Sequence, residues 1–229
     1  MKKFVLSACF ALSALGAAAQ SPISFQVKAG VGTAYFGGKN TSVYDTKLAY
    51  KVGVGMDYAF SRMWSLQPTL NFVSKGSKGE VESLAKFTMD ELYLELPVLL
   101  TAHLHVDDRT NFTFAAGPYI AYGIAGTTTA DFGSGVSLPT ESGNIYVSGE
   151  QKINTFGSLE DGYMGGKRFD VGIAFAVGIE YRHFIFGADA QIGLTTVNDV
   201  VGDLVNAGSY SERISPKNVS VFFSVGYKF

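Results

Sequence analysis

The sequence is poor in charged residues, which make up 17% of its 229 residues, whereas a typical soluble domain has about 25%. Lysine and arginine number 18 and aspartate and glutamate 20, so the formal net charge is −2. This even balance provides no basic surface, and we therefore expect no nucleic acid as a partner. The low charge indicates instead a surface that faces something other than water.

Cysteine is almost absent as well. The single cysteine, Cys9, lies in an N-terminal segment that is basic at its start, apolar as far as Leu15 and rich in small residues up to Ala19, which is the pattern of a secretory signal peptide. We expect cleavage after Ala19, so that residues 1–19 are the signal peptide and residues 20–229 the mature domain. A lipoprotein site at Cys9 would leave about three apolar residues before it, too few for export. The mature chain then has no thiol chemistry.

The chain also lacks long apolar runs and catalytic motifs. No stretch after the signal approaches the roughly 18 apolar residues of a transmembrane helix, and there is no G-x-S-x-G, H-E-x-x-H or phosphate-loop pattern. His103 and His105 stand two apart near Asp107 and Asp108, but no third ligand follows at a metal-site spacing. We interpret them as a polar strand end and turn. We therefore predict no catalytic, cofactor-binding or metal-ligating residues, and expect that the protein is not an enzyme.

The chain is rich in alternation. In the last segment, apolar or aromatic residues occupy every second position from Val219 to Phe229, which is typical of a strand with two unlike faces. Seven more segments share this period: residues 25–35, 48–60, 66–72, 92–100, 112–124, 169–181 and 184–192. Long connections (residues 36–46, 74–88, 127–166 and 195–216) alternate with short ones, including residues 103–110, as in outer-membrane barrels.

This pattern predicts an all-β fold, an eight-stranded antiparallel up-and-down transmembrane β-barrel in the cell outer membrane. An even number of strands places both termini at one end, and the short turns predict that this end is periplasmic. Two local features are expected to interrupt the regularity. Pro68 predicts a bulge or a weak rung in its strand, and Ile145 to Ile153 has the pattern of a hairpin within the long connection 127–166.

The composition of the second strand face decides between a membrane barrel and a soluble lipocalin-type barrel. A soluble barrel would need a polar outer face, but the second face consists mainly of Gly, Ala, Thr, Ser and Gln with isolated charges. Eight strands leave an interior just wide enough for side chains. We therefore expect the charges to lie in the lumen and to neutralise one another, or alternatively to gate a small conductance. These residues are Lys28, Lys51, Asp57, Glu95, Asp170, Glu180, Asp189 and Lys228.

Several segments resemble a known family. The stretch from Leu92 to Leu100 (LYLELPVLL), the Gly117-Pro-Tyr119 segment, the glycine-rich first strands and the terminal Tyr227-Lys-Phe229 are similar to the small outer-membrane β-barrel family typified by PorT, of the OmpA/OmpX-like eight-stranded architecture. The resemblance implies an outer-membrane barrel over the whole mature chain. It also implies that Tyr227 and Phe229 form the signal read by the barrel-assembly machinery. It implies no activity for most members, and a secretion role is not carried over.

The expected function is that of a non-enzymatic outer-membrane barrel. Its long extracellular loops, chiefly residues 127–166, would bind an extracellular ligand or an envelope protein, while lipid and the assembly machinery are its other partners. One alternative is a small, porin-like solute channel with a charged lumen. The other is an outer-membrane enzyme that uses loop carboxylates such as Asp161 or Asp199.

Overall fold

The computed structural model describes residues 22–38, 41, 44–81, 85–133, 135–140, 143–158, 162–197 and 215–229. The predicted signal peptide, residues 1–19, lies outside the described residues. Where the structure describes the chain, it contains strands and no helix, and thus no helix able to span a membrane. The strands are β1 (Ile23–Gly37), β2 (Tyr44–Asp45), β3 (Lys47–Ala59), β4 (Trp64–Val81), β5 (Ala85–Asp107), β6 (Thr110–Asp131), β7 (Val136–Thr140), β8 (Gly143–Val147), β9 (Glu150–Asn154), β10 (Phe169–Tyr181), β11 (Phe184–Gly193) and β12 (Lys217–Lys228).

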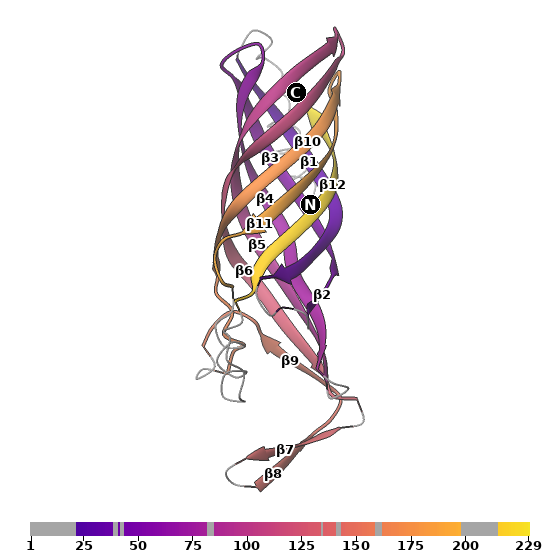
Figure 1. Cartoon of the computed structure of the whole chain (residues 1–229), viewed down its shortest axis with the longest axis vertical. Coiled ribbons are helices and arrows are strands. Elements are labelled where there is room, and N and C mark those ends of the chain that lie inside the picture. Colours follow the sequence, from indigo (N-terminus) through magenta and orange to yellow (C-terminus); the bar gives the residue numbers. More distant parts are fainter. Residues whose placement is uncertain are drawn as a thin grey trace, which may run out of the picture.

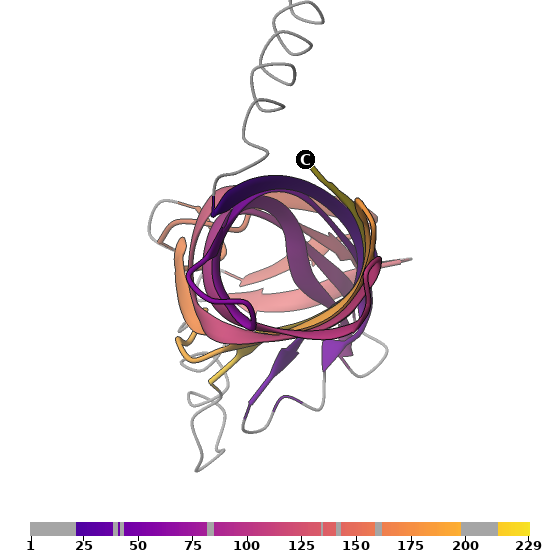
Figure 2. The same ribbon diagram turned by 90° about the horizontal axis from the view of Figure 1, so that it is seen from above.

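Eight of these strands close into an antiparallel ring in the order β1, β3, β4, β5, β6, β10, β11 and β12 (Figures 1 and 2). The ring is closed by β12, which pairs with β1 from Gln26↔Lys228 to Gly37↔Lys217. Closure leaves the strands of the ring without free edges. The predicted eight-stranded antiparallel barrel is thus confirmed.

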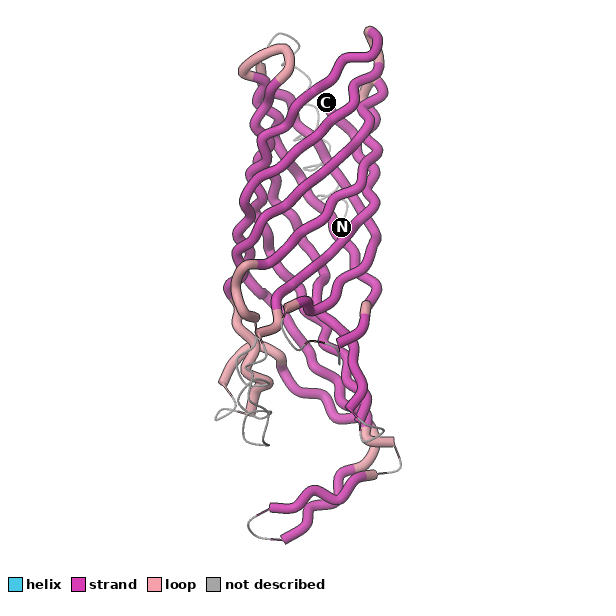
Figure 3. The backbone as a smooth tube through the Cα atoms, viewed as in Figure 1, coloured by secondary structure: helices cyan, strands magenta, loops and turns pink. Residues whose placement is uncertain are grey.

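The alternation in the sequence separates the two surfaces of the wall. Outward side chains are large and apolar, and Leu48, Val31 and Phe223 are 75%, 63% and 70% exposed. Their inward neighbours are small or polar, as at Ala49, which is fully buried. An exposed apolar surface this continuous marks a surface that contacts something other than water. The strands run obliquely around the barrel (Figure 3).

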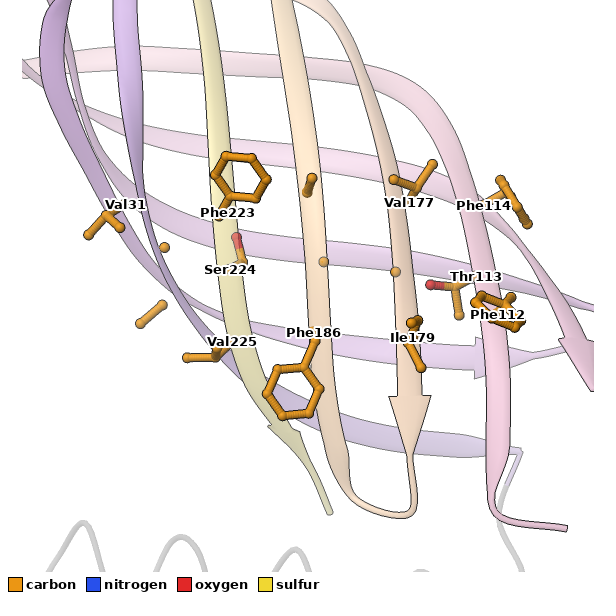
Figure 4. A pocket seen from close by; sticks show the side chains of 15 residues that line it. Val31, Phe112, Thr113, Phe114, Val177, Ile179, Phe186, Phe223, Ser224 and Val225 are labelled. Carbon is orange, nitrogen blue, oxygen red and sulfur yellow. The ribbon is translucent and has the colours of Figure 1, made fainter. Parts of the chain in front are cut away.

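An apolar groove of about 850 Å³ follows this outer wall across β6, β10, β11, β12 and β1 (Figure 4). It forms where the small outward residues Ala29 and Ala188 stand between the larger Phe186, Phe223 and Val225. It is therefore a depression in the apolar surface.

The two ends of the barrel differ. At the short-turn end, the connections are residues 60–63, 108–109 and 182–183, and the described C-terminus lies at the same end. Backbone hydrogen bonds link the turns to their neighbours: Arg182 N donates to Arg109 O of the next turn at 2.8 Å, and Lys228 N at the end of the last strand donates to His183 O at 2.7 Å. The opposite end, which we call the hairpin end, carries the other four connections between strands of the ring. The predicted connection at residues 103–110 is wrong in extent, because β5 continues to Asp107.

The predicted loop at residues 74–88 is also wrong. Instead β4 and β5 continue as one hairpin, paired rung by rung from Ser74↔Leu92 to Val81↔Ala85. Gly76 permits this path, because its φ of +119° is unfavourable for other residues. A Cβ at this position would also lie 2.0 Å from the carbonyl oxygen of Met89.

The long connection 127–166 is more ordered than predicted. Strand β6 continues to Asp131 and pairs there with β9, while β7 and β8 form a separate hairpin. The prediction of a hairpin at Ile145 to Ile153 is wrong in its bounds, since that range divides between β8 and β9. In the last connection, residues 198–214 lie outside the described part of the chain.

Strand pairing is irregular at several places, and one of them is the predicted position of Pro68. Around Pro68 the ladder between β3 and β4 is interrupted, but Gly55↔Thr69 and Tyr58↔Leu66 share one register, so Pro68 makes a weak rung and no bulge. The register shifts occur instead between β5 and β6, at Leu92/Tyr93 and at His105/Asp107.

Candidate functional site

The lumen near the short-turn end contains a cluster of ionisable side chains. The Lys228 ammonium pairs with Asp57 and lies 3.4 Å from Glu180 Oε1. His103, which the sequence places before a turn, projects into this cluster from β5, and its Nδ1 lies 3.6 Å from Glu180 Oε2. Three of the predicted lumen residues therefore meet here, although they come from β3, β10 and β12, which are not hydrogen-bonded neighbours.

The same histidine forms an arrangement that resembles a serine hydrolase triad. His103 Nε2 lies 2.8 Å from Ser65 Oγ, while Glu180 faces its other ring nitrogen. A nucleophile must be reachable by substrate, but Ser65 is 0% exposed. We therefore interpret this hydrogen bond as part of the packing that fills the lumen.

Next to this cluster, toward the hairpin end, the middle of the lumen contains Lys51, Asp189 and Lys28. Lys51 pairs with Asp189, which also accepts a hydrogen bond from Ser224 Oγ at 3.2 Å. Lys28 borders two cavities of about 50 Å³ each, and Asp189 borders both as well. Each cavity exceeds the roughly 10–15 Å³ that one water needs, so this part of the lumen has room for water.

The hairpin-end half of the lumen is centred on Lys75, which is 0% exposed. Its ammonium lies 2.7 Å from Glu95 Oε2 and 3.7 Å from Asp170 Oδ2. The ring of Tyr119 lies 4.4 Å from the same nitrogen and that of Tyr93 5.6 Å. One buried cation thus balances two predicted carboxylates and stands against two aromatic faces.

The two carboxylates also have neutral hydrogen-bond donors. Asp170 accepts hydrogen bonds from Tyr119 Oη, Asn218 Nδ2 and Thr195 Oγ1 at 3.1, 3.0 and 2.8 Å. Glu95 accepts one from Gln191 Nε2 at 2.6 Å. Asp170 therefore does not depend on Lys75 alone, a difference that a mutational test can use.

Packed side chains close the lumen beyond Lys75. Tyr93, Tyr119 and Phe156 form one buried cluster, with Tyr93 and Phe156 edge to face at 5.7 Å. A second cluster, further toward the hairpin end, contains Phe36, Tyr44, Met89 and Val197. With side chains packed in this way and cavities of about 50 Å³ beside Lys28, the described part of the interior is that of a closed barrel.

All eight predicted lumen charges therefore lie on the inner face, seven in ion pairs and Lys28 beside the cavities. The sequence misses Lys75 and His103 as members of these clusters. Lys75 has the right signal, because it continues the inward parity of Asn71 and Val73, but the surrounding glycines and charges obscure it.

The described residues offer no site for a metal. Within the described ranges, no group of three or more histidine, cysteine, aspartate or glutamate side chains could hold a metal ion. The loop carboxylates Asp161 and Asp199, considered for an enzyme, lie outside the described residues.

The predicted insertion signal ends the barrel wall. Tyr227 pairs with Val27 and Phe184 across β12, and its ring meets those of Phe184 and Phe229 edge to face at 5.5 and 5.2 Å. Its other neighbour is the His183 ring, which stacks on it at 5.5 Å. The last residues thus join the first strand to the third short turn.

A projecting sheet continues past the ring at the hairpin end (Figure 1). It consists of β2, β9, residues 74–81 of β4, residues 85–90 of β5 and residues 127–131 of β6. The β7–β8 hairpin extends from its tip and is closed at its base by a hydrogen bond from Phe132 N to Gly149 O at 3.1 Å.

The family comparison agrees with this architecture. The sequence profile of the family described as "Outer membrane protein beta-barrel domain" matches residues 18–199. No curated protein sequence matches the chain significantly. Similar solved structures include Ail, the attachment invasion locus protein of Yersinia pestis, with 10% identity and a TM-score of 0.39 over 90% of this chain and 98% of that one. The Neisserial surface protein A has 10% identity and a TM-score of 0.43 over 90% and 97%. The outer membrane enzyme PagL has 13% identity and a TM-score of 0.41 over 87% and 97%.

Proposed function

Because this chain belongs to the outer membrane protein beta-barrel domain family, we propose that it is a non-enzymatic outer-membrane barrel whose projecting sheet and β7–β8 hairpin bind a partner outside the cell or in the envelope. The single observation that supports this proposal is the contrast between the two halves of the molecule. The lumen is filled, whereas the hairpin end presents a sheet and a hairpin that extend past the ring.

The proposed orientation places the short-turn end in the periplasm, and with it both ends of the mature chain. Outer-membrane barrels keep short turns on the periplasmic side and long loops outside. Tyr227 and Phe229 are then the signal for the barrel-assembly machinery, and lipid surrounds the apolar wall. Membership of the PorT type within the family stays a prediction.

A solute channel is the less favoured function, because ions or solutes would have to pass Lys75 with its carboxylates and the packed rings of Tyr93, Tyr119 and Phe156. A planar bilayer recording distinguishes the two proposals. We expect no steady, well-resolved openings from the wild-type barrel, and such openings would favour the channel.

The register of the hairpin end suggests a clean test of binding. Asp131 pairs with Glu150 as the last rung between β6 and β9, so residues 132–149 can be replaced by Asn-Gly, a favoured two-residue hairpin turn. We expect this variant to insert normally, to keep its heat-modifiable mobility, and to lose proteins that the wild type captures from intact envelopes by crosslinking. A matched control shortens the 60–63 turn at the other end. Equal capture by wild type and the excised variant would contradict the assignment of binding to the hairpin.

A further inference from the structure

Arginine is placed unevenly in this barrel. The described part of the chain contains four arginines, and Arg62, Arg109 and Arg182 each lie in a different one of the three short turns. The fourth, Arg168, lies at the hairpin end, donates to the Gly123 carbonyl at 2.8 Å and stands over the Phe156 ring. Arg168 is thus anchored to the barrel's own backbone, although its side chain is exposed like those of the three turn arginines at the rim.

Arg182 occupies a position that its backbone disfavours. Residues 182–183 form a two-residue connection between the paired Tyr181 and Phe184, and Arg182 has a φ of +55°, the only positive φ of a non-glycine residue in the described ranges. Glycine is preferred where the first residue of such a turn has a positive φ. A strained position of this kind motivates the hypothesis of a role for the side chain, and the Arg182 guanidinium lies 5.6 Å from the centre of the Tyr181 ring.

Large apolar side chains flank two of the three turn arginines. Phe60 and Trp64 flank Arg62 and are 54% and 40% exposed, while Tyr181 and Phe184 flank Arg182 and are 45% and 53% exposed. Such exposed aromatic residues lie at the level of lipid headgroups in membrane barrels. In the proposed membrane placement, the guanidinium groups of Arg62 and Arg182 would therefore stand at the level of the phosphates.

From this placement, and resting on the proposed membrane insertion, we infer that the short-turn rim is a binding surface for anionic phospholipid headgroups, with Arg62, Arg109 and Arg182 as its phosphate ligands. The planar guanidinium presents paired donors that match phosphate oxygens. The three turns are unequal, because Asp107 and Asp108 share the turn of Arg109. Arg62 and Arg182 therefore contribute more to the preference for anionic lipid than Arg109.

The only tryptophan, Trp64, reports on this surface because it lies two residues from Arg62. The test reconstitutes the full mature barrel into vesicles of phosphatidylcholine with brominated phosphatidylglycerol, or the reverse, and measures quenching of Trp64. The wild type should favour phosphatidylglycerol. Arg62→Gln should lower that preference about fivefold, the effect of one basic side chain near a charged membrane surface. The control Arg168→Gln should leave it unchanged.

A second variant separates lipid binding from folding. Arg182→Gly relieves the positive φ and should make the barrel more resistant to urea, yet it should retain fewer phosphatidylglycerol molecules in native mass spectrometry. An unchanged lipid preference in Arg62→Gln, or full lipid retention in Arg182→Gly, would overturn the inference. Either result leaves the proposed partner binding intact, because partner capture is measured at the opposite end of the barrel.

Discussion

Replacing Lys75 with methionine tests the buried charge cluster that fills the lumen. The change keeps a long unbranched side chain but removes the ammonium beside Glu95 and Asp170, at 2.7 and 3.7 Å. Breaking a buried ion pair by removing one partner costs about 3–5 kcal/mol, because the remaining charge is uncompensated. We expect Lys75→Met to lower the free energy of unfolding by this amount.

The double variant Lys75→Met/Glu95→Gln provides the matched comparison. The glutamine introduced by Glu95→Gln still offers its carbonyl oxygen to Gln191, and Asp170 keeps its three neutral donors. With only one carboxylate left and that one hydrogen-bonded, we expect the double variant to recover about half of the loss.

The assay is urea unfolding of the barrel in lipid vesicles, followed by Trp64 fluorescence and by heat-modifiable mobility on gels. Trp64 lies at the short-turn end, away from Lys75, so its signal reports global unfolding and not the substituted site. The reasoning is refuted if Lys75→Met costs less than about 1 kcal/mol, or if the double variant is less stable than the single one.

Three further predictions concern the backbone, the C-terminus and one turn. Gly76→Ala should cost more than about 3 kcal/mol, because it adds a steric clash to an unfavourable φ, whereas Gly149→Ala, with φ +71° and open space around its Cβ, should cost about 1 kcal/mol in the same urea assay. Deleting Tyr227 to Phe229 should reduce heat-modifiable barrel in the outer membrane far more than Lys228→Met; equal amounts would contradict an insertion signal. In the β5–β6 turn, the backbone N–H of Arg109 donates to the Asp107 carboxylate and holds the pKa of that carboxyl below its usual value. The stability that this hydrogen bond contributes is therefore present above the unfolded-state pKa and is lost as the pH falls through the folded-state pKa. Asp107→Ala should therefore lower the urea midpoint at neutral pH, and the difference in midpoint between wild type and variant should become smaller in acid. A difference in midpoint that does not change with pH would count against this prediction.

The sequence predicts the ring of strands well, because lipid on one side and a narrow lumen on the other impose the period of two. The strands are not recognised where they continue past the ring at the hairpin end. In β4, residues 74–80 are serine, lysine, glycine or glutamate on both faces, so the alternation vanishes although the hydrogen bonding with β5 continues. The threonines at the end of β6 lose the signal for the same reason.

The charge clusters are only half predictable. Alternation places Asp57, Glu180 and Lys228 on the inner face, but their meeting depends on the stagger of strands across the lumen, which no local pattern contains. The same holds for Lys75 and Asp170. His103 is missed because a histidine near a turn looks like an exposed polar residue until the extent of β5 and the bulge at its end are known.

The paired residues Asp131 and Glu150 separate the β7–β8 hairpin from the barrel, because β6 and β9 are already hydrogen-bonded on the barrel side of this pair. Insertions, deletions and exchanges within residues 132–149, beyond this pair, leave the ladder beneath them unchanged. Related chains are therefore free to diverge here in length and composition while their walls keep one register. For the same reason, and in the orientation proposed, a foreign peptide placed between these two residues would be displayed outside the cell without a cost to assembly.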